Sequence, residues 1–198
     1  MQAYAPDCVV QHLVDEALLR DAQTLGVEDA TIVARVTQRM NEASENGARV
    51  VVCTCSTIGG IAENVDPHGR FLPMRIDRAM ADEAVERGEQ ILIVAALEST
   101  IRPTQRLVED SAATRGRHVN IRTMVVQSAW PFFLSGNLVA YCAQIEQAIR
   151  DQARNGDVVV LAQASMAPVG KVLIGPDVQV LSSPELGVRR AIQAARVR

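Results

Sequence analysis

The sequence predicts an α/β protein built from two pseudo-symmetric lobes, each a parallel sheet flanked by helices. Short apolar runs alternate with helical patterns along the chain, which is typical of parallel sheets with helices on both faces. One phrase also occurs twice, because VVVCTCST at residues 50–57 is matched by VVVLAQAS at residues 158–165. Each phrase follows a helical stretch ending in Asn-Gly, at Asn46 and Asn155. The repeat therefore predicts two related halves with their strand ends facing one ligand cleft.

The first half is predicted to contain two strands and two helices. Residues 8–13 are expected to form a short strand, followed by a turn-rich passage through residues 21–26. Apolar residues at helical spacing predict a helix over 29–45. The unbroken β-branched run at 50–53 is typical of a parallel strand covered on both faces, and a tight turn through Gly-Gly follows it. An amphipathic helix is expected over 76–87, with the next glycine as its stop.

The second half continues the alternation of strand and helix. A strand over 91–95 leads to a helix over 103–115, in which Pro103 suits the first turn. Residues 118–126 are predicted to form a strand and residues 138–154 a helix with an apolar stripe. The remaining predicted elements are strands over 158–161 and 178–181 and a terminal helix over 186–196.

Composition excludes several classes of partner. The 198 residues carry a net charge of −3 with scattered basic side chains, so the sequence predicts no positively charged surface that would bind nucleic acid. No apolar run approaches the roughly 20 residues that span a bilayer, so no membrane partner is expected. The first residues lack a basic-then-apolar secretory pattern, which favours a cytoplasmic protein.

The cysteines and the single lysine limit which cofactors the protein could use. Four cysteines in a chain of this class favour free thiols over disulfides. Zinc is the weaker alternative, because Cys53-x-Cys55 has no second cysteine pair and no histidine lies at metal-ligand spacing beside it. Lys171 is the one candidate for a pyridoxal phosphate Schiff base, and no glycine-rich nucleotide loop is present. We therefore expect neither a metal nor an organic cofactor.

Five segments follow one another along the chain in this order: CTCSTIGG, MRIDRAMADEAVERG, ILIVAALESTIRPTQRLVEDSA, VVVLAQASMAP and LSSPELGVRRAI. Taken together, they resemble the aspartate/glutamate racemase superfamily, specifically its Asp/Glu/hydantoin racemase branch. That resemblance implies a first lobe of residues 1–88 plus 181–198, a second lobe of residues 89–180, and a ligand between them. It also implies a strand-helix unit ahead of residues 8–19. We therefore expect either a misplaced start codon or a shortened form whose first sheet lacks an edge or central strand, which would favour dimer contacts or incomplete folding.

The family places two cysteines on opposite sides of a small carboxylate substrate. Inverting a carbon acid needs one group to remove a proton and another to deliver one to the opposite face. A thiol suits both tasks because its reference pKa, near 8.5, is within reach of neutral pH. By resemblance, Cys55 takes the first thiol position, and Ser56 and Thr57 are carboxylate ligands.

The second position departs from the family pattern. Gln163 stands where the partner cysteine belongs, and an amide cannot accept and return a proton near neutral pH. One-sided chemistry is therefore favoured over two-base racemisation, which would need Ser165, water or another group as second base. Thr100 matches the family's hydroxyl contact and Ser99 is a weaker candidate; Ala164 completes the predicted substrate-binding set.

Each candidate also has a purely structural interpretation. Cys55 could fill the core, as most strand-end cysteines do, and Ser56 and Thr57 could simply cap the turn. Gln163 could be a buried amide that fixes its loop. The leading hypothesis is a cofactor-independent isomerase, akin to an amino-acid racemase, that acts on a small carboxylate or amino acid through Cys55. The alternatives are a single-thiol decarboxylase-like enzyme and an inactive small-molecule-binding protein; a homodimer is the family expectation.

Overall fold

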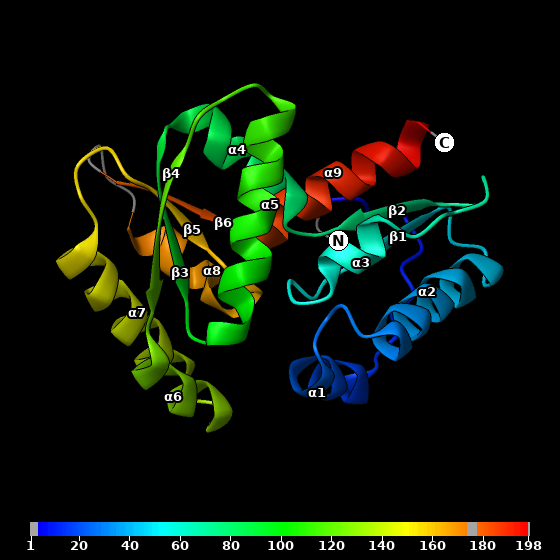
Figure 1. The fold of residues 1–198 in the computed structure, drawn as a ribbon, viewed down its shortest axis with the longest axis horizontal. Coiled ribbons are helices and arrows are strands. Elements are labelled where there is room, and N and C mark those ends of the chain that lie inside the picture. The colour runs from blue at the N-terminus through cyan, green and yellow to red at the C-terminus, as the bar shows by residue number, and fades with distance from the viewer. Residues whose placement is uncertain (1–3, 174–177, 198) are drawn as a thin grey trace. The chain divides into compact units, whose positions relative to one another are not determined.

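Parallel sheets flanked by helices make up the protein, as the sequence predicts (Figure 1). The structure, a computed structural model, describes residues 4–173 and 178–197. The chain divides into two compact units. The first unit comprises the described residues up to Asp77 and those from Glu185 on, and the second unit runs from Arg78 to Pro184. Helix α4 (Arg78–Arg87) falls in the second unit, whereas the sequence led us to expect these residues in the first lobe.

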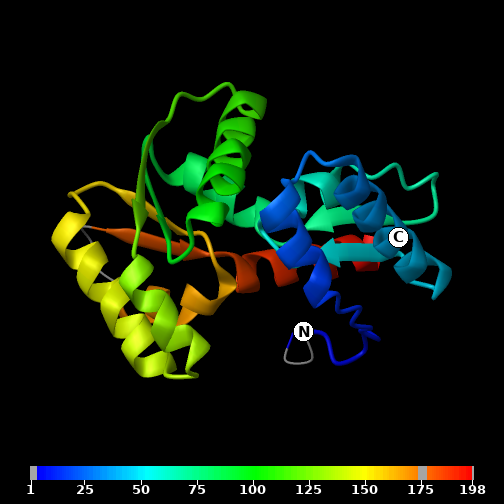
Figure 2. The same ribbon diagram turned by 60° about the horizontal axis from the view of Figure 1, so that its bottom comes forward.

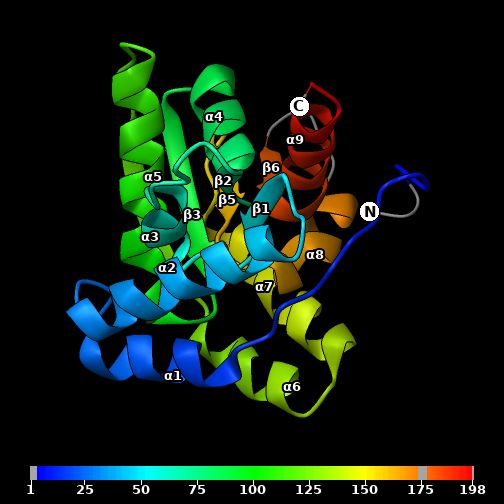
Figure 3. The ribbon, with the colours of Figure 1, turned by 90° about the vertical axis from the view of Figure 1, so that its right-hand side faces the viewer.

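The first unit contains a two-stranded parallel sheet. Strand β1 (Val50–Cys53) pairs with β2 (Leu72–Arg75) so that Cys53 lies opposite Arg75 at the carboxyl end of both strands. Helices α2 and α3 contact these strands, and α1 packs on α2 (Figure 3). The helices of this unit are α1 (Glu16–Leu25), α2 (Ala30–Glu45), α3 (Gly59–Glu63) and most of α9 (Ser183–Val197).

One apolar cluster holds the first unit together. Helix α2 supplies Ile32, Val36 and Met40 at spacings of four, which places them on one face of the helix. Val51 of β1 and Phe71, just before β2, pack against the same cluster. The predicted helix over 29–45 is thus confirmed, and the Asp29 side chain caps it by accepting a hydrogen bond from the Thr31 N–H at 2.8 Å.

The prediction of a strand over residues 8–13 is wrong. The structure has irregular backbone there, shown in dark blue in Figure 2. Two apolar side chains of this stretch lie largely in solvent, with Val9 91% exposed and Leu13 48% exposed, so little burial offsets the ordering of the chain. The expected turn-rich passage after it is wrong as well. Asp15 accepts a hydrogen bond from the Leu18 N–H at 3.0 Å and thereby starts helix α1.

Two further elements of the first unit were not predicted. The tight turn predicted through Gly59-Gly60 is wrong, because these glycines are the first two residues of the short helix α3. Strand β2 precedes the helix that we expected to begin at Ile76. Strand β2 contains Pro73, which lacks a backbone N–H and breaks the pattern expected of a strand. The helix itself begins two residues later, at Arg78.

The second unit contains a four-stranded parallel sheet in the order β4-β3-β5-β6. Helices α4 and α5 lie over one face of this sheet, and α6, α7 and α8 lie over the other (Figure 1). The helices α6 and α8 were not predicted, whereas the four strands and α5 and α7 were. The strands are β3 (Gln90–Ala95), β4 (Asn120–Val125), β5 (Val158–Leu161) and β6 (Gln179–Ser182); the remaining helices are α5 (Ile101–Thr114), α6 (Trp130–Leu134), α7 (Leu138–Gln152) and α8 (Ala167–Val172).

The two central strands of this sheet are buried on both faces. All four residues of β5 are buried, as are five of the six residues of β3. Leu92 and Val94 face the cluster formed with Tyr141 and Ile145 of α7, so the alternate residues of β3 face α4 and α5. This explains why both strands read as uninterrupted apolar runs in the sequence.

None of the helices within the described residues is both long enough and apolar enough to cross a membrane.

Candidate active site

The two copies of the repeated phrase occupy equivalent places in the two units. Strand β1 ends at Cys53 and β5 ends at Leu161, and each strand is parallel to its neighbours. Cys55 and Gln163 therefore both lie two residues beyond a strand's carboxyl end. In open α/β sheets this edge is where ligands bind.

Cys55 lies in the first unit, in the loop that joins β1 to α3. Its side chain is partly exposed, and on one side it packs against the apolar cluster around Val51 and Phe71. The thiol is thus neither fully enclosed nor free of the core. Partial exposure is a property that a reactive thiol requires, but all four cysteines are partly exposed, so exposure alone does not distinguish Cys55.

Cys53 is also partly exposed and packs against the same apolar cluster as Cys55. Its Sγ donates a weak hydrogen bond to the Cys55 carbonyl oxygen at 3.6 Å, and burial raises the pKa of the Cys53 thiol to about 12. At neutral pH Cys53 is therefore a protonated packing group.

The neighbouring hydroxyl residues are positioned by the same loop. Thr57 is buried, with 7% of its surface exposed, and Ser56 is half-buried. The loop runs directly into the five-residue helix α3. Ser56 and Thr57 thus share one short segment with Cys55, as the sequence predicts, while their contact with a substrate stays a prediction.

A buried ion pair lies against this loop, and the sequence reasoning missed it. The Arg75 side chain is 4% exposed and that of Asp77 1% exposed. Arg75 donates from Nε to Asp77 Oδ1 at 2.6 Å and from Nη2 to Asp77 Oδ2 at 2.9 Å. The same Nη2 lies 3.4 Å from the carbonyl oxygen of Ser56. Arg and Asp two residues apart at a strand end share one face of the strand, so the spacing itself was a signal that could have been used.

The second unit has a topological switch point between β3 and β5. These neighbouring strands are paired, but β3 leads to α5 on one face of the sheet and β5 leads to α8 on the other (Figure 1). Loops that diverge in this way leave a crevice at the carboxyl ends of the two strands. Five predicted site residues begin the diverging loops: Ser99, Thr100, Gln163, Ala164 and Ser165.

Gln163 links the two loops at this switch point. Its Oε1 accepts a hydrogen bond from the backbone N–H of Ala96 at 2.6 Å, just beyond the end of β3. Ala96 is fully buried, so without this bond its N–H would be a hydrogen-bond donor with no acceptor, which would destabilise the fold. The amide oxygen therefore has a structural role, which was one of the two interpretations left open by the sequence. The amide NH2 group is the part of Gln163 suited to a ligand contact.

The other residues at the switch point differ in their surroundings. Thr100 is 6% exposed, and its Oγ1 donates to the Leu97 carbonyl oxygen at 2.8 Å, so it stabilises the turn before α5. Ser165 lies 2.8 Å, Oγ to OH, from the fully buried Tyr141 of α7. Ser99 and Ala164 are exposed.

The predicted site residues thus form two groups, one in each unit. Cys55, Ser56 and Thr57 share the β1 loop, and the remaining five share the loops after β3 and β5. The expected ligand cleft between the two lobes stays a prediction. No cluster of three or more metal-ligating side chains occurs within residues 4–173 and 178–197.

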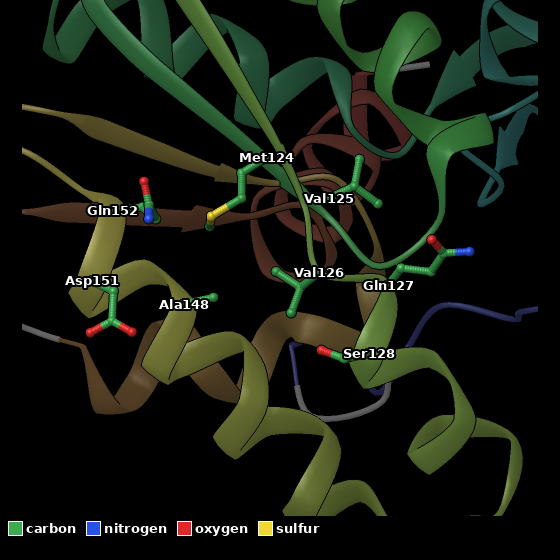
Figure 4. A pocket seen from close by; sticks show the side chains of 8 residues that line it. All are labelled: Met124, Val125, Val126, Gln127, Ser128, Ala148, Asp151 and Gln152. Carbon is green, nitrogen blue, oxygen red and sulfur yellow. The ribbon is translucent and has the colours of Figure 1, made fainter.

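A separate hollow lies on the second unit, between the end of β4 and the C-terminal half of α7. Figure 4 shows its lining, with the carboxylate of Asp151 and the amide of Gln152 on the α7 side. It contains none of the predicted site residues. Its lining offers one carboxylate and neither a thiol nor an imidazole, so it lacks the groups needed for proton transfer at carbon. The lining residues are Met124, Val125, Val126, Gln127, Ser128, Ala148, Asp151 and Gln152.

Comparison with solved structures defines the fold as that of racemase-type proteins. A putative Asp/Glu racemase from Yersinia pestis superposes with a TM-score of 0.63 at 14% identity, over 98% of this chain and 88% of that one. A glutamate racemase from Campylobacter jejuni subsp. jejuni gives 0.56 at 16% identity, over 85% and 70% of the two chains. The allantoin racemase from Klebsiella pneumoniae gives 0.56 at 15% identity, over 84% and 67%. No family model and no curated protein sequence matches the chain.

Proposed function

We propose that this protein is a cofactor-independent enzyme of the racemase and isomerase class that acts on a small carboxylate or amino acid. Cys55 serves as the proton donor and acceptor or as the nucleophile. The fold supports this proposal, because the proteins that share it include a glutamate racemase and an allantoin racemase. The observation that carries it is the position of Cys55 two residues beyond the carboxyl end of β1, next to Ser56 and Thr57, in a loop whose Ser56 carbonyl oxygen is contacted by the buried Arg75.

The proposed chemistry is one-sided. The Gln163 amide cannot act as a general acid or base near neutral pH, and its oxygen accepts a hydrogen bond from the Ala96 N–H. In the decarboxylase-like alternative, the substrate carries two carboxylates on its α-carbon; one leaves as carbon dioxide, and the electron pair of the broken bond is delocalised into the remaining carboxylate as an enediolate. The Cys55 thiol then delivers its proton to the α-carbon, and water reprotonates the thiolate. Loss and return of one α-proton by Cys55 alone is the corresponding exchange reaction.

Two-base racemisation would need a second acid-base group, on the face of the substrate opposite Cys55. Ser165 is the candidate in the second unit, because its hydroxyl is already hydrogen-bonded to the buried Tyr141 phenol. Burial raises the pKa of Tyr141, which keeps this phenol protonated at neutral pH. The pair can therefore act as a hydrogen-bonding group but is poorly suited to take up a proton.

Exchange of α-hydrogen for deuterium tests the proposal directly. A panel of chiral amino acids and 2-substituted carboxylates is incubated with the protein in deuterium oxide, and loss of the α-proton signal is followed by NMR. Chiral chromatography of the same samples separates exchange with retention from racemisation. We expect exchange of at least one panel member, abolished in Cys55→Ala and kept in Cys142→Ala. Exchange that persists in Cys55→Ala would reject Cys55 as the acid-base group.

A second variant addresses the other strand end. Gln163→Cys places a thiol two residues beyond β5, where the family has its second cysteine. We expect this variant to convert one-sided exchange into racemisation of the same substrate. The matched Gln163→Ser variant should not do so, because a serine hydroxyl holds its proton too tightly near neutral pH.

A binding protein without catalytic activity is the second candidate function. The hydrogen bond from Ala96 to Gln163 favours it, because a side chain with a structural role stands in the second thiol position. The two functions differ in the reactivity of Cys55. An active-site thiol should react with iodoacetamide near neutral pH faster than free cysteine, whereas an inert one should react more slowly.

A further inference from the structure

We propose that the Arg75–Asp77 pair is a positioning device for the loop that carries Cys55. This inference rests on the proposed function of Cys55 and extends it to residues outside the repeated phrase. Arg75 is the last residue of β2, and Cys53 opposite it is the last residue of β1. The Ile76 N–H continues the strand pairing with the Cys53 carbonyl oxygen at 3.0 Å. The Arg75 side chain therefore starts beside the point where the Cys55 loop leaves the sheet.

The guanidinium contacts the loop on both sides of Thr57. On one side its Nη2 lies 3.4 Å from the carbonyl oxygen of Ser56, the residue directly after Cys55. On the other side it lies against Gly59, where an added Cβ would be 3.1 Å from Arg75 Nε and 3.2 Å from Cζ. At Gly60 an added Cβ would be 3.5 Å from Nη1. Glycine at position 59 thus gives the guanidinium the space to lie directly under the backbone.

Asp77 fixes the orientation of the guanidinium plane. Two parallel hydrogen bonds join the carboxylate to Nε and Nη2, and such a fork permits only one relative orientation of the two groups. With Arg75 held in this way, the Ser56 peptide and the start of α3 are held as well. Cys55 lies between the strand and these fixed points, so its backbone has little freedom.

Stability alone does not explain a buried ion pair at this place. Removing two charges from water is costly, and well-packed apolar side chains of similar volume stabilise a core equally well or better. An ion pair that is almost fully buried therefore requires another explanation, and here the guanidinium is the group that bonds the loop. Neither methionine nor leucine could replace the guanidinium here, because neither side chain can donate a hydrogen bond to the Ser56 carbonyl oxygen.

The test replaces the pair by apolar residues and measures both the loop and the thiol. In the double variant Arg75→Met, Asp77→Leu no charge is left unpaired, so the fold should persist. Hydrogen exchange followed by mass spectrometry reports the protection of residues 54–60. Iodoacetamide labelling near neutral pH reports the rate at Cys55, which fragment ions distinguish from Cys53. We expect at least tenfold faster exchange in 54–60 and at least tenfold slower labelling of Cys55, with an unchanged circular dichroism spectrum.

Arg75→Lys is the second variant, for the case in which the double variant does not fold. It keeps a positive charge facing Asp77 but loses the planar fork and the reach to Ser56, so it should show the same two changes to a smaller extent. Arg122→Lys is the matched control for Arg75→Lys, because it also keeps a positive charge facing a buried carboxylate. Arg122 pairs with Asp157, whose carboxylate is 3% exposed, in the second unit, so weakening that pair should leave both readouts unchanged.

The outcomes separate the two proposals. Unchanged protection of 54–60 and unchanged labelling of Cys55 in both Arg75 variants would overturn the positioning role and leave the proposed function intact. If wild-type Cys55 labels no faster than free cysteine, the proposed function fails, and the hydrogen exchange still decides whether the pair holds the loop. Faster exchange in 54–60 together with slower labelling, at a rate that Arg75→Lys partly restores, supports the positioning role.

Discussion

Substituting Gly187 by alanine should destabilise the first unit, although alanine is the better helix former. Gly187 lies in α9, close to the backbone that leaves β2. An added Cβ would be 2.0 Å from the Ile76 carbonyl oxygen and 2.7 Å from Ile76 Cδ1. Ile76 cannot move away freely, because its N–H is bonded to the Cys53 carbonyl oxygen at 3.0 Å. Either the helix or the end of β2 must shift to accept the methyl group.

The structure gives the direction and size of this effect. Overpacking a buried contact costs about 1 to 3 kcal/mol, and an overlap with backbone falls at the upper end of that range. Alanine in place of glycine returns about 1 kcal/mol of helix propensity. The net loss is about 2 kcal/mol, which lowers the melting temperature of a chain of this size by about 4 to 8 °C.

Thermal unfolding followed by circular dichroism and calorimetry measures this shift. Gly170→Ala is the matched control, because Gly170 also lies in a helix, α8, but its added Cβ would be 3.6 Å from Val180 Cγ1, an ordinary contact. That variant should melt at or slightly above the wild-type temperature. A Gly187→Ala protein that melts as high as the wild type would refute the close packing of α9 against Ile76.

Two further predictions concern Cys53 and Asp15. Burial raises the pKa of Cys53 from its ordinary 9.0 to about 12, so the unfolded chain loses the thiol proton at a lower pH than the folded protein does. The stability that the protonated thiol contributes is therefore fully present below pH 9 and is lost as the pH rises toward 12. Urea unfolding at about pH 8 and about pH 10.5 gives the free energy of unfolding at each pH. Between these two pH values it should fall less in Cys53→Ala than in the wild type, by up to about 1.4 kcal/mol per pH unit. Equal falls in the two proteins would contradict the burial of this thiol. Asp15→Ala removes the cap of α1 and the partner of Arg35 and Arg39, and it should cost about 1 kcal/mol in urea unfolding. Asp15→Asn, which keeps a capping oxygen, should lose less, and an Asp15→Ala protein as stable as the wild type would show that α1 does not need its cap.

Elements that are buried on both faces could be predicted from the sequence. Strands β3 and β5 lie in the middle of a sheet, and their unbroken apolar runs follow directly from that position. Helix α2 shows its buried face as Ile32, Val36 and Met40 at helical spacing. In these elements the local pattern and the tertiary environment agree, so the pattern alone was sufficient.

Elements that depend on a neighbour could not be predicted. Residues 8–13 have the composition of a strand, but the structure pairs them with no strand and leaves Val9 in solvent. Strand β2 has a proline and no β-branched residue, yet it forms because β1 offers a partner. The same contrast applies to the site. The repeated phrase indicated Cys55 and Gln163, but it gave no information on the hydrogen bond between Gln163 and Ala96.

The sequence by itself determined the fold class and the positions at which reactive side chains follow strand ends, because periodicity and repetition are properties of neighbouring residues along the chain. Only the tertiary structure decided that Arg75 and Asp77 are buried together beneath the Cys55 loop. It also decided that Gln163 joins the loops after β3 and β5. Burial and hydrogen bonding depend on groups brought together from distant parts of the chain, so the same arginine could have been a solvated surface residue in another fold.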